Sequence, residues 1–230
     1  MAKAPYRPPV AGPAFIRLLA GFADGALPGT SPDLSDRLSQ WVDWNRAVAL
    51  SRALDGRLPA AVPEAPVFDS AEQAECERVH AALRASITAD IEARRATAGE
   101  DFAPHRQHCM SVQRSMQAAT GRLRGRLRDM LGQGDGALAR LAEVDAVMEQ
   151  TLSPREQALL GAVPALLGQH FERLRAAAAP GDGDTDEALP APAPPGWLAR
   201  FHQDMQDVLL AELDVRFQPI EGLLAALRPR

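Results

Sequence analysis

Residues 109–130, CMSVQRSMQAATGRLRGRLRDM, carry apolar or small side chains at steps of three or four. This spacing places one such side chain per turn on the same face of an α-helix, as in a coiled-coil seam. The seam comprises Cys109, Val112, Met116, Thr120, Leu123, Leu127 and Met130. The glycine-rich stretch 132–136 follows and predicts a turn that ends this helix.

The segment before this seam shows the same periodicity. It begins after a cap at Asp69 or Ser70 and ends before Gly99. Its apolar stripe comprises Cys76, Val79, Leu83, Ile87 and Ile91. Asp101 to Pro104 mark a boundary, because proline is tolerated only in the first turn of a helix. We therefore expect a hairpin that turns near residue 100 and places residue 76 beside residue 124.

The segments after residue 136 continue the helical pattern. The stretch 153–156, SPRE, is a capping-box pattern that starts a fresh helix or bends the existing one. Pro164 predicts a kink in the segment 159–174, unless its missing N–H donor is tolerated at a bend. A last helix is expected to begin near Trp197, with a further kink at Pro219. The periodic positions are Leu138, Leu141, Asp145, Met148, Leu152, Leu159, Val163, Leu166, His170, Leu174, Leu198, Phe201, Met205, Val208, Leu209, Leu213, Ile220, Leu224 and Leu227.

Composition supports an all-α fold. Hydrophobic residues make up 46% of the 230-residue chain, which excludes wholesale disorder and predicts a packed core. Aromatic residues are only 5%, and the abundance of Ala and Leu favours helices over sheets. The net charge of −5 creates no overall field that would attract nucleic acid or anionic lipid. Lys3 is the only lysine among 25 basic residues, and this arginine usage points to a GC-rich bacterial genome.

No part of the sequence approaches the roughly 18 consecutive apolar residues of a membrane span, and the first residues lack an apolar secretory signal. We therefore expect a cytoplasmic protein without membrane insertion, in which Cys76 and Cys109 stay reduced. The predicted fold is an elongated antiparallel helical bundle, coiled-coil-like, with Pro- and Gly-rich connectors. Its first expected part is an N-terminal helical segment over 1–55, with a short helix and a tryptophan-containing helix that starts at Ser31-Pro32. The other parts are a proline-rich connector over 56–68, a bundle core over 69–179, a flexible linker over 180–196 and a C-terminal amphipathic helix over 197–230.

Several short motifs in a fixed order resemble a proteobacterial family, the domain of unknown function 3348 family. They are FIRLL at 15–19, LSQWVDW at 38–44, AVALS at 47–51, FAP at 102–104 with Arg106, Gln113 and Met116, LRGRLR at 123–128, VPALL at 163–167 and FERL at 171–174. The resemblance covers most of the chain. It implies no activity, cofactor or catalytic residue. Because family members tend to be encoded near envelope proteins, it implies an accessory role in an envelope-associated complex.

Cysteine and histidine residues at helical spacing form the first candidate site, since thiolates and imidazoles three or four residues apart can chelate zinc. The five are Cys76, His80, His105, His108 and Cys109. A hairpin that turns near residue 100 would hold the two groups about 22 Å apart at 1.5 Å per residue, too far for one metal. The seam positions of both cysteines favour core packing, because a free cysteine behaves as a small hydrophobe. A metal or redox site is the alternative.

A run of arginines is the second candidate. It comprises Arg122, Arg124, Arg126 and Arg128. Alternate helical residues lie about 200° apart, so the run flanks both sides of the seam and forms no single basic stripe. We expect pairing with acidic residues across the hairpin, and contact with phosphate is the alternative. The acidic residues placed to meet the run are Glu72, Glu75 and Glu77.

Trp41 and Trp44 form the third candidate, either as core anchors of their own helix or as a surface that contacts a partner. The sequence contains no nucleophile in a strand–turn–helix context and no glycine loop followed by Lys-Ser or Lys-Thr, so we expect no enzyme and no cofactor. The leading prediction is an interaction or assembly protein that presents its leucine-rich seams to itself or to another helical protein. A nucleic-acid-associated protein is the alternative, and a metal or thiol sensor is the third hypothesis.

Overall fold

The computed structural model describes residues 13–22, 41–56, 70–97, 101–179 and 196–228, and these residues form helices and no strand. The helices are α1 (Ala14–Phe22), α3 (Trp44–Asp55), α4 (Ser70–Thr97), α5 (Ala103–Gly132), α6 (Gly136–Leu160), α7 (Val163–Ala178) and α8 (Trp197–Leu227). None of the described helices combines the length and the apolarity needed to cross a membrane. The predicted start at Ser31-Pro32, the connector from residue 57 and the linker 180–195 lie outside the described residues.

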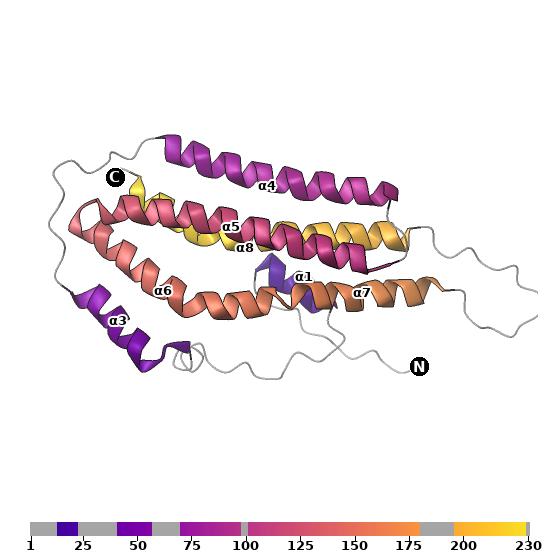
Figure 1. The fold of residues 1–230 in the computed structure, drawn as a ribbon, viewed down its shortest axis with the longest axis horizontal. Coiled ribbons are helices and arrows are strands. Elements are labelled where there is room, and N and C mark those ends of the chain that lie inside the picture. The colour runs from indigo at the N-terminus through magenta and orange to yellow at the C-terminus, as the bar shows by residue number, and fades with distance from the viewer. Residues whose placement is uncertain (1–12, 23–40, 57–69, 98–100, 180–195, 229–230) are drawn as a thin grey trace, which may run out of the picture.

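The helices form the elongated antiparallel bundle that the sequence predicts (Figure 1). α4 runs opposite to α5, and α6 continued by α7 runs opposite to α5 and α8. α5 and α8 run in the same direction and pack along each other at the centre. Phe102 contacts Phe201, and Gln113 contacts Glu212. The two residues of each pair are 99 positions apart in the sequence, and a constant separation of this kind is what two parallel helices produce. α4 covers the α5–α8 pair on one side, mainly through α8, while α6 and α7 lie on the opposite side of this pair.

The core is built from the predicted seams. Every seam residue of α5 is buried except Met130, which is partly buried. The most deeply buried residues of α8 are Phe201, Met205, Val208, Leu209, Leu213 and Ile220. Burying each such side chain stabilises the fold by about 1.5–3 kcal/mol relative to leaving it exposed. The C-terminal helix α8 therefore docks on its own chain, against α4, α5 and α7.

The connection between α6 and α7 differs from the prediction. α6 continues through Pro154 and ends at Leu160, and α7 begins at Val163. The segment that carries Pro164 is interrupted, as predicted, but by a break between Leu160 and Val163 and not by a kink within a helix: the proline occupies the first turn of α7, where no helical N–H is required. The Gln113 side chain donates to the Leu160 carbonyl at 2.8 Å, so α5 supplies a partner for the end of α6.

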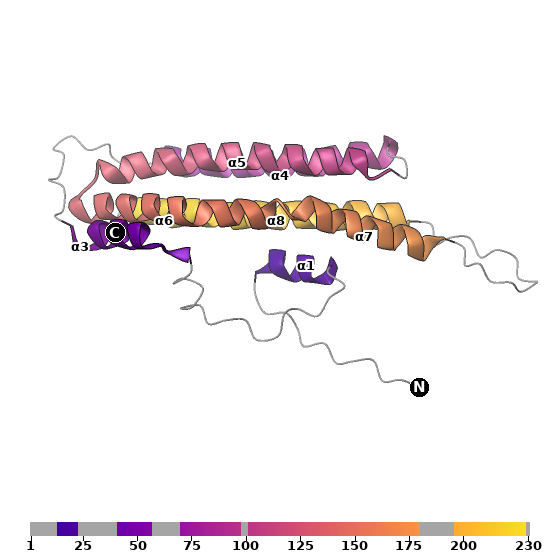
Figure 2. The same ribbon diagram turned by 60° about the horizontal axis from the view of Figure 1, so that its bottom comes forward.

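Two helices from the N-terminal part lie on the side of the bundle away from α4 (Figure 2). α1 rests on α7 and α8 with Phe15 and Phe22 buried. α3 packs against α6. The single helix predicted across both tryptophans is broken, since α3 begins after Asp43, whose side chain accepts from the Arg46 N–H at 2.8 Å.

Candidate functional site

A cleft of about 560 Å³ opens where α6 gives way to α7, between this junction, α5 and α8. We call it the α6–α7 cleft. Its apolar walls are Phe102, Met110, Leu160, Pro164 and Ala165. Its polar lining consists of Arg106, Gln113, Arg114, Gln117, Gln157 and Arg216. This volume and mixed lining are those of a small-molecule site.

The wall at Phe102 is tightly packed. A Cβ atom on Gly168 of α7 would lie 2.8 Å from the Phe102 ring, so the absence of a side chain at position 168 lets the ring sit against α7. The ring also lies near Phe171, with 5.5 Å between centroids. Close packing of this kind holds the aromatic wall in place.

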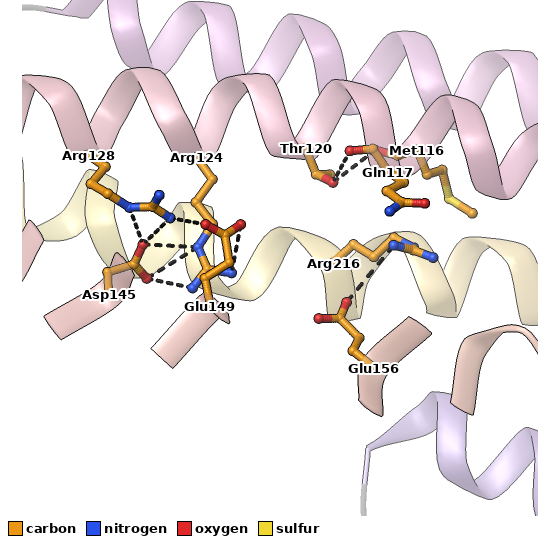
Figure 3. A network of polar contacts seen from close by, with 9 residues as sticks. All are labelled: Met116, Gln117, Thr120, Arg124, Arg128, Asp145, Glu149, Glu156 and Arg216. Atoms are coloured by element: carbon orange, nitrogen blue, oxygen red, sulfur yellow. Dashed lines mark hydrogen bonds and ion pairs between the residues drawn. The ribbon is translucent and has the colours of Figure 1, made fainter. Parts of the chain in front are cut away.

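A buried polar cluster lies beside the cleft. The Glu212 carboxylate is 0% exposed. It accepts from the Gln113 amide at 2.9 Å and from Arg216 Nε at 2.9 Å. Burial raises the pKa of Glu212 above its ordinary value, and the hydrogen bonds from Gln113 and Arg216 oppose that rise. Arg216 also approaches Glu156 of α6 at 4.0 Å (Figure 3). The cluster thus joins α5, α6 and α8 at the edge of the cleft.

The cleft has a local positive charge in a chain whose net charge is −5. None of the described residues that line it is acidic. Arg106 and Arg114 are exposed, lie on either side of Met110 along α5 and form no ion pair with a described residue. The arrangement can accept an anionic group beside an apolar body.

The predicted arginine run meets acidic partners, but mostly not those expected. Arg124 and Arg128 both hold Asp145 of α6, at 2.6 Å and 2.8 Å (Figure 3). Glu149, one turn further along α6, approaches the same two guanidinium groups. Because α6 lies beside this flank of α5, the prediction that acids of α4 pair with these two arginines is wrong.

The charges in this network support one another. Burial alone would raise the pKa of Asp145, but the hydrogen bonds from Arg124 and Arg128 outweigh it and hold that pKa below its ordinary value. For Arg128, burial is likewise outweighed by its hydrogen bonds to Asp145 and Glu149, and its pKa is raised. We call these four residues the Asp145 network.

The other two arginines of the run differ from each other. Arg126 pairs with Glu72 of α4 at 3.2 Å, as the predicted hairpin requires. Arg122 is exposed and forms no ion pair within the described part of the chain. The other two predicted acids bond within α4, where Glu75 pairs with Arg78 and Glu77 accepts from Gln73. Three of the four arginines are therefore already paired with carboxylates.

The cysteine and histidine candidates fall into two separate groups. His80 lies 3.4 Å from Asp214 of α8, and its ring packs against Phe217. His105 is buried against Phe201 and His202 of α8. His202 precedes Asp214, the partner of His80, by twelve residues, so the two groups lie about 18 Å apart along α8. Across the described residues, no group of three or more His, Cys, Asp or Glu side chains is arranged to hold a metal ion.

The two cysteines occupy the core as their seam positions predict, and His108 is buried next to Cys109. Cys76, His108 and Cys109 are buried. Burial raises the pKa of Cys109 to about 12, and the nearby Glu212 adds to the rise. Burial also raises the pKa of Cys76. Both thiols therefore stay protonated at neutral pH, which makes them poor nucleophiles.

The two tryptophans have different environments. Trp41 is partly buried, and the guanidinium carbon of Arg155 lies 5.2 Å from the centre of its ring, a cation–π contact between α6 and the residue three positions before α3. Trp44 is 81% exposed. Trp44 is therefore not a core anchor of its helix.

Sequence reasoning missed the Glu212 cluster and the buried His202, and it placed His170 on the apolar stripe without identifying its polar partner. His170 lies 2.7 Å from Asp204 and stacks on Phe22 of α1, while His202 is buried beside His105. Glu212 and Arg216 are four residues apart, a spacing that is common on exposed helix faces. One available signal was the run of apolar neighbours on both sides of Glu212, which indicates a helix buried all round.

Fold and site together define an all-α, elongated helical-bundle protein with a cleft of mixed polar and apolar lining at a helix break. The chain belongs to the family described as protein of unknown function (DUF3348), whose model matches residues 1–229. No curated protein and no solved structure matches the chain.

Proposed function

We propose that this protein is a non-enzymatic, cytoplasmic helical interaction protein that binds a protein partner through the outer face of α3. The observation that carries the proposal is Trp44, a large aromatic side chain that is 81% exposed. Leu54, near the other end of α3, is 48% exposed. Large apolar side chains left in water on one helix mark interaction surfaces.

Because the predicted seams are buried, few helix surfaces remain for binding a protein partner. The leucine-rich faces of α5 and α8 are covered by other helices of the same chain, so they are not free to receive a partner. α3, in contrast, lies at the outside of the bundle and packs against α6 (Figure 2). We therefore replace the seams with α3 as the proposed contact surface.

The start of α3 is held in place, which suits a contact surface. Asp43 caps the helix and pairs with Arg46 at 2.8 Å, and Arg155 of α6 stacks on Trp41. A helix start that is fixed in this way loses little backbone freedom on binding, and tryptophan is enriched among the residues that dominate interface energies.

Nucleic-acid binding, the alternative function, gains no support from the described residues. Arg124 and Arg128 are engaged by Asp145, and Arg126 by Glu72. A phosphate would have to displace these carboxylates. The accessory role in an envelope-associated complex that the family resemblance implies stays a prediction, and it is compatible with binding through α3.

The test compares the full-length chain with Trp44→Ala and with the matched control Leu159→Ala. Leu159 is 70% exposed on α6, so its replacement also removes an exposed apolar side chain, but from another helix. In-cell crosslinking should capture a partner with the wild type and with Leu159→Ala, and lose it with Trp44→Ala.

Light scattering over a concentration series then shows whether that partner is a second copy of the chain. A partner retained equally by all three proteins would contradict the proposal. So would a monomer that captures nothing.

A further inference from the structure

The α6–α7 cleft changes in character along α5. Near Phe102 it is walled by the aromatic ring, which packs against Gly168 of α7, and by Pro164 one turn earlier on α7, while Leu160 lies at the level of Gln113, which donates to its carbonyl at 2.8 Å. Three to four turns later along α5, Gln113, Arg114 and Gln117 line it, with Gln157 from α6 opposite. The cleft therefore combines apolar walls with polar donors: the amide groups and Arg114 gather at one end, and Arg106 is the charged residue near Phe102.

The charges of the cleft select an anion. Arg216 is 9% exposed and already bound to the Glu212 carboxylate, so its charge is largely satisfied. Arg114 keeps its charge available, since its Nε donates only to the Met110 carbonyl at 3.2 Å and no described carboxylate pairs with it. An arginine beside amide donors, with no acid in the described lining, favours a carboxylate.

The apolar part of the cleft also needs an occupant. Met110, between Arg106 and Arg114, is 44% exposed, although its thioether side chain suits adaptable apolar contact. A cavity of about 560 Å³ accommodates a chain of several carbons next to these walls.

We propose that the α6–α7 cleft binds a small organic carboxylate with an apolar body, such as a medium-chain fatty acid. The carboxylate lies at Arg114, Gln117 and Gln157, and the apolar body extends past Met110 towards Phe102. Arg106 contributes a second, weaker attraction from the opposite end. This site is independent of the proposed contact surface on α3, because no residue of α3 lines it.

Decanoate is the probe for the test, added to the full-length chain and followed by the ¹³C-methyl resonance of Met110 and by calorimetry. We expect saturable binding that shifts this resonance. 1-Decanol, which has the chain without the charge, and acetate, which has the charge without the chain, should each bind at least about tenfold more weakly.

Variants on α5 identify the contacts. Arg114→Gln should weaken decanoate binding about tenfold, and Arg106→Gln should weaken it less. Arg122→Gln is the matched control, because Arg122 is an exposed arginine of the same helix outside the cleft, and it should bind like the wild type. All three positions are exposed, so the variants should fold, which circular dichroism checks.

An unshifted Met110 resonance at saturating decanoate would overturn the proposal. Equal affinities of the Arg114→Gln and Arg122→Gln variants would overturn it too. Loss of partner capture in the Trp44→Ala experiment has no bearing on this result.

Discussion

Two charged clusters cross the bundle from α5, one to Asp145 on α6 and one to Glu212 on α8. In the first, two arginines surround one carboxylate whose side chain is 12% exposed, and the pKa of Asp145 is lowered. In the second, one arginine and one amide hold a carboxylate that is 0% exposed, and the pKa of Glu212 is raised.

The difference lies in how far ion pairing offsets desolvation. At Asp145, hydrogen bonds to Arg124 and Arg128 exceed the cost of burial, so the ionised form stabilises the fold. At Glu212, burial dominates, so the ionised form is held at a cost. A carboxyl group whose pKa is raised by burial beside a cleft is a feature that functional sites share, whereas the Asp145 network is best explained as a clamp between two helices.

Replacing Arg216 gives the largest expected effect and would break the Glu212 cluster. Arg216→Met leaves the buried Glu212 carboxylate with only the Gln113 hydrogen bond. We expect the free energy of unfolding at neutral pH to fall by about 3–5 kcal/mol, measured by urea denaturation. Glu156→Gln is the control, because Glu156 is 42% exposed and 4.0 Å from Arg216, and it should cost less than about 1 kcal/mol.

A smaller effect is expected in the Asp145 network. Asp145→Asn keeps the shape of the side chain but removes the charge that Arg124 and Arg128 share. Because Glu149 still approaches both arginines, the loss should be limited to about 2 kcal/mol in urea unfolding at neutral pH. No measurable loss would show that the network does not clamp α5 to α6.

The smallest effect is expected for the ion pair between Arg126 and Glu72, in which the arginine is exposed at the surface. Arg126 belongs to the same arginine run, but its side chain is 55% exposed where it meets Glu72. Solvent screens the exposed guanidinium, although the Glu72 side chain is only 13% exposed, so Arg126→Gln should change the unfolding free energy by less than about 1 kcal/mol. A loss as large as that of Asp145→Asn would mean that burial does not set the strength of these pairs.

The seams of α4, α5 and α8 could be predicted from the sequence, because each has one uninterrupted apolar stripe with clear boundary residues. The junction of α6 and α7 could not. The SPRE motif at 153–156 resembles a helix start, yet α6 continues through it and ends at Leu160, where Gln113 of α5 binds its last carbonyl. That boundary depends on a contact between helices, which local sequence does not encode.

The candidate site was harder to predict than the fold. Arg124 and Arg128 were correctly expected to pair with carboxylates, but the register of α6 against α5 decides which ones. Glu212 resembles a surface residue in any pairwise pattern. Its burial follows from the central position of α8, which α4, α5 and α7 all contact. Such positions become visible only once the packing is known.

The most direct test of this comparison is the pH dependence of the unfolding free energy for the wild type, Asp145→Asn and Glu212→Gln. A carboxyl group with a lowered folded pKa adds stability above its unfolded pKa and loses it as the pH falls. One with a raised folded pKa binds its proton more tightly in the folded state, so stability falls as the pH rises from the unfolded to the folded pKa.

The wild type should therefore gain stability relative to Asp145→Asn as the pH rises through the acidic range. Relative to Glu212→Gln, it should lose stability as the pH rises from the unfolded pKa of Glu212 to its higher folded pKa. Two differences of opposite slope are the predicted result. Two differences that rise together with pH would contradict the account, because Glu212 would then be a stabilising ion pair of the same kind as Asp145.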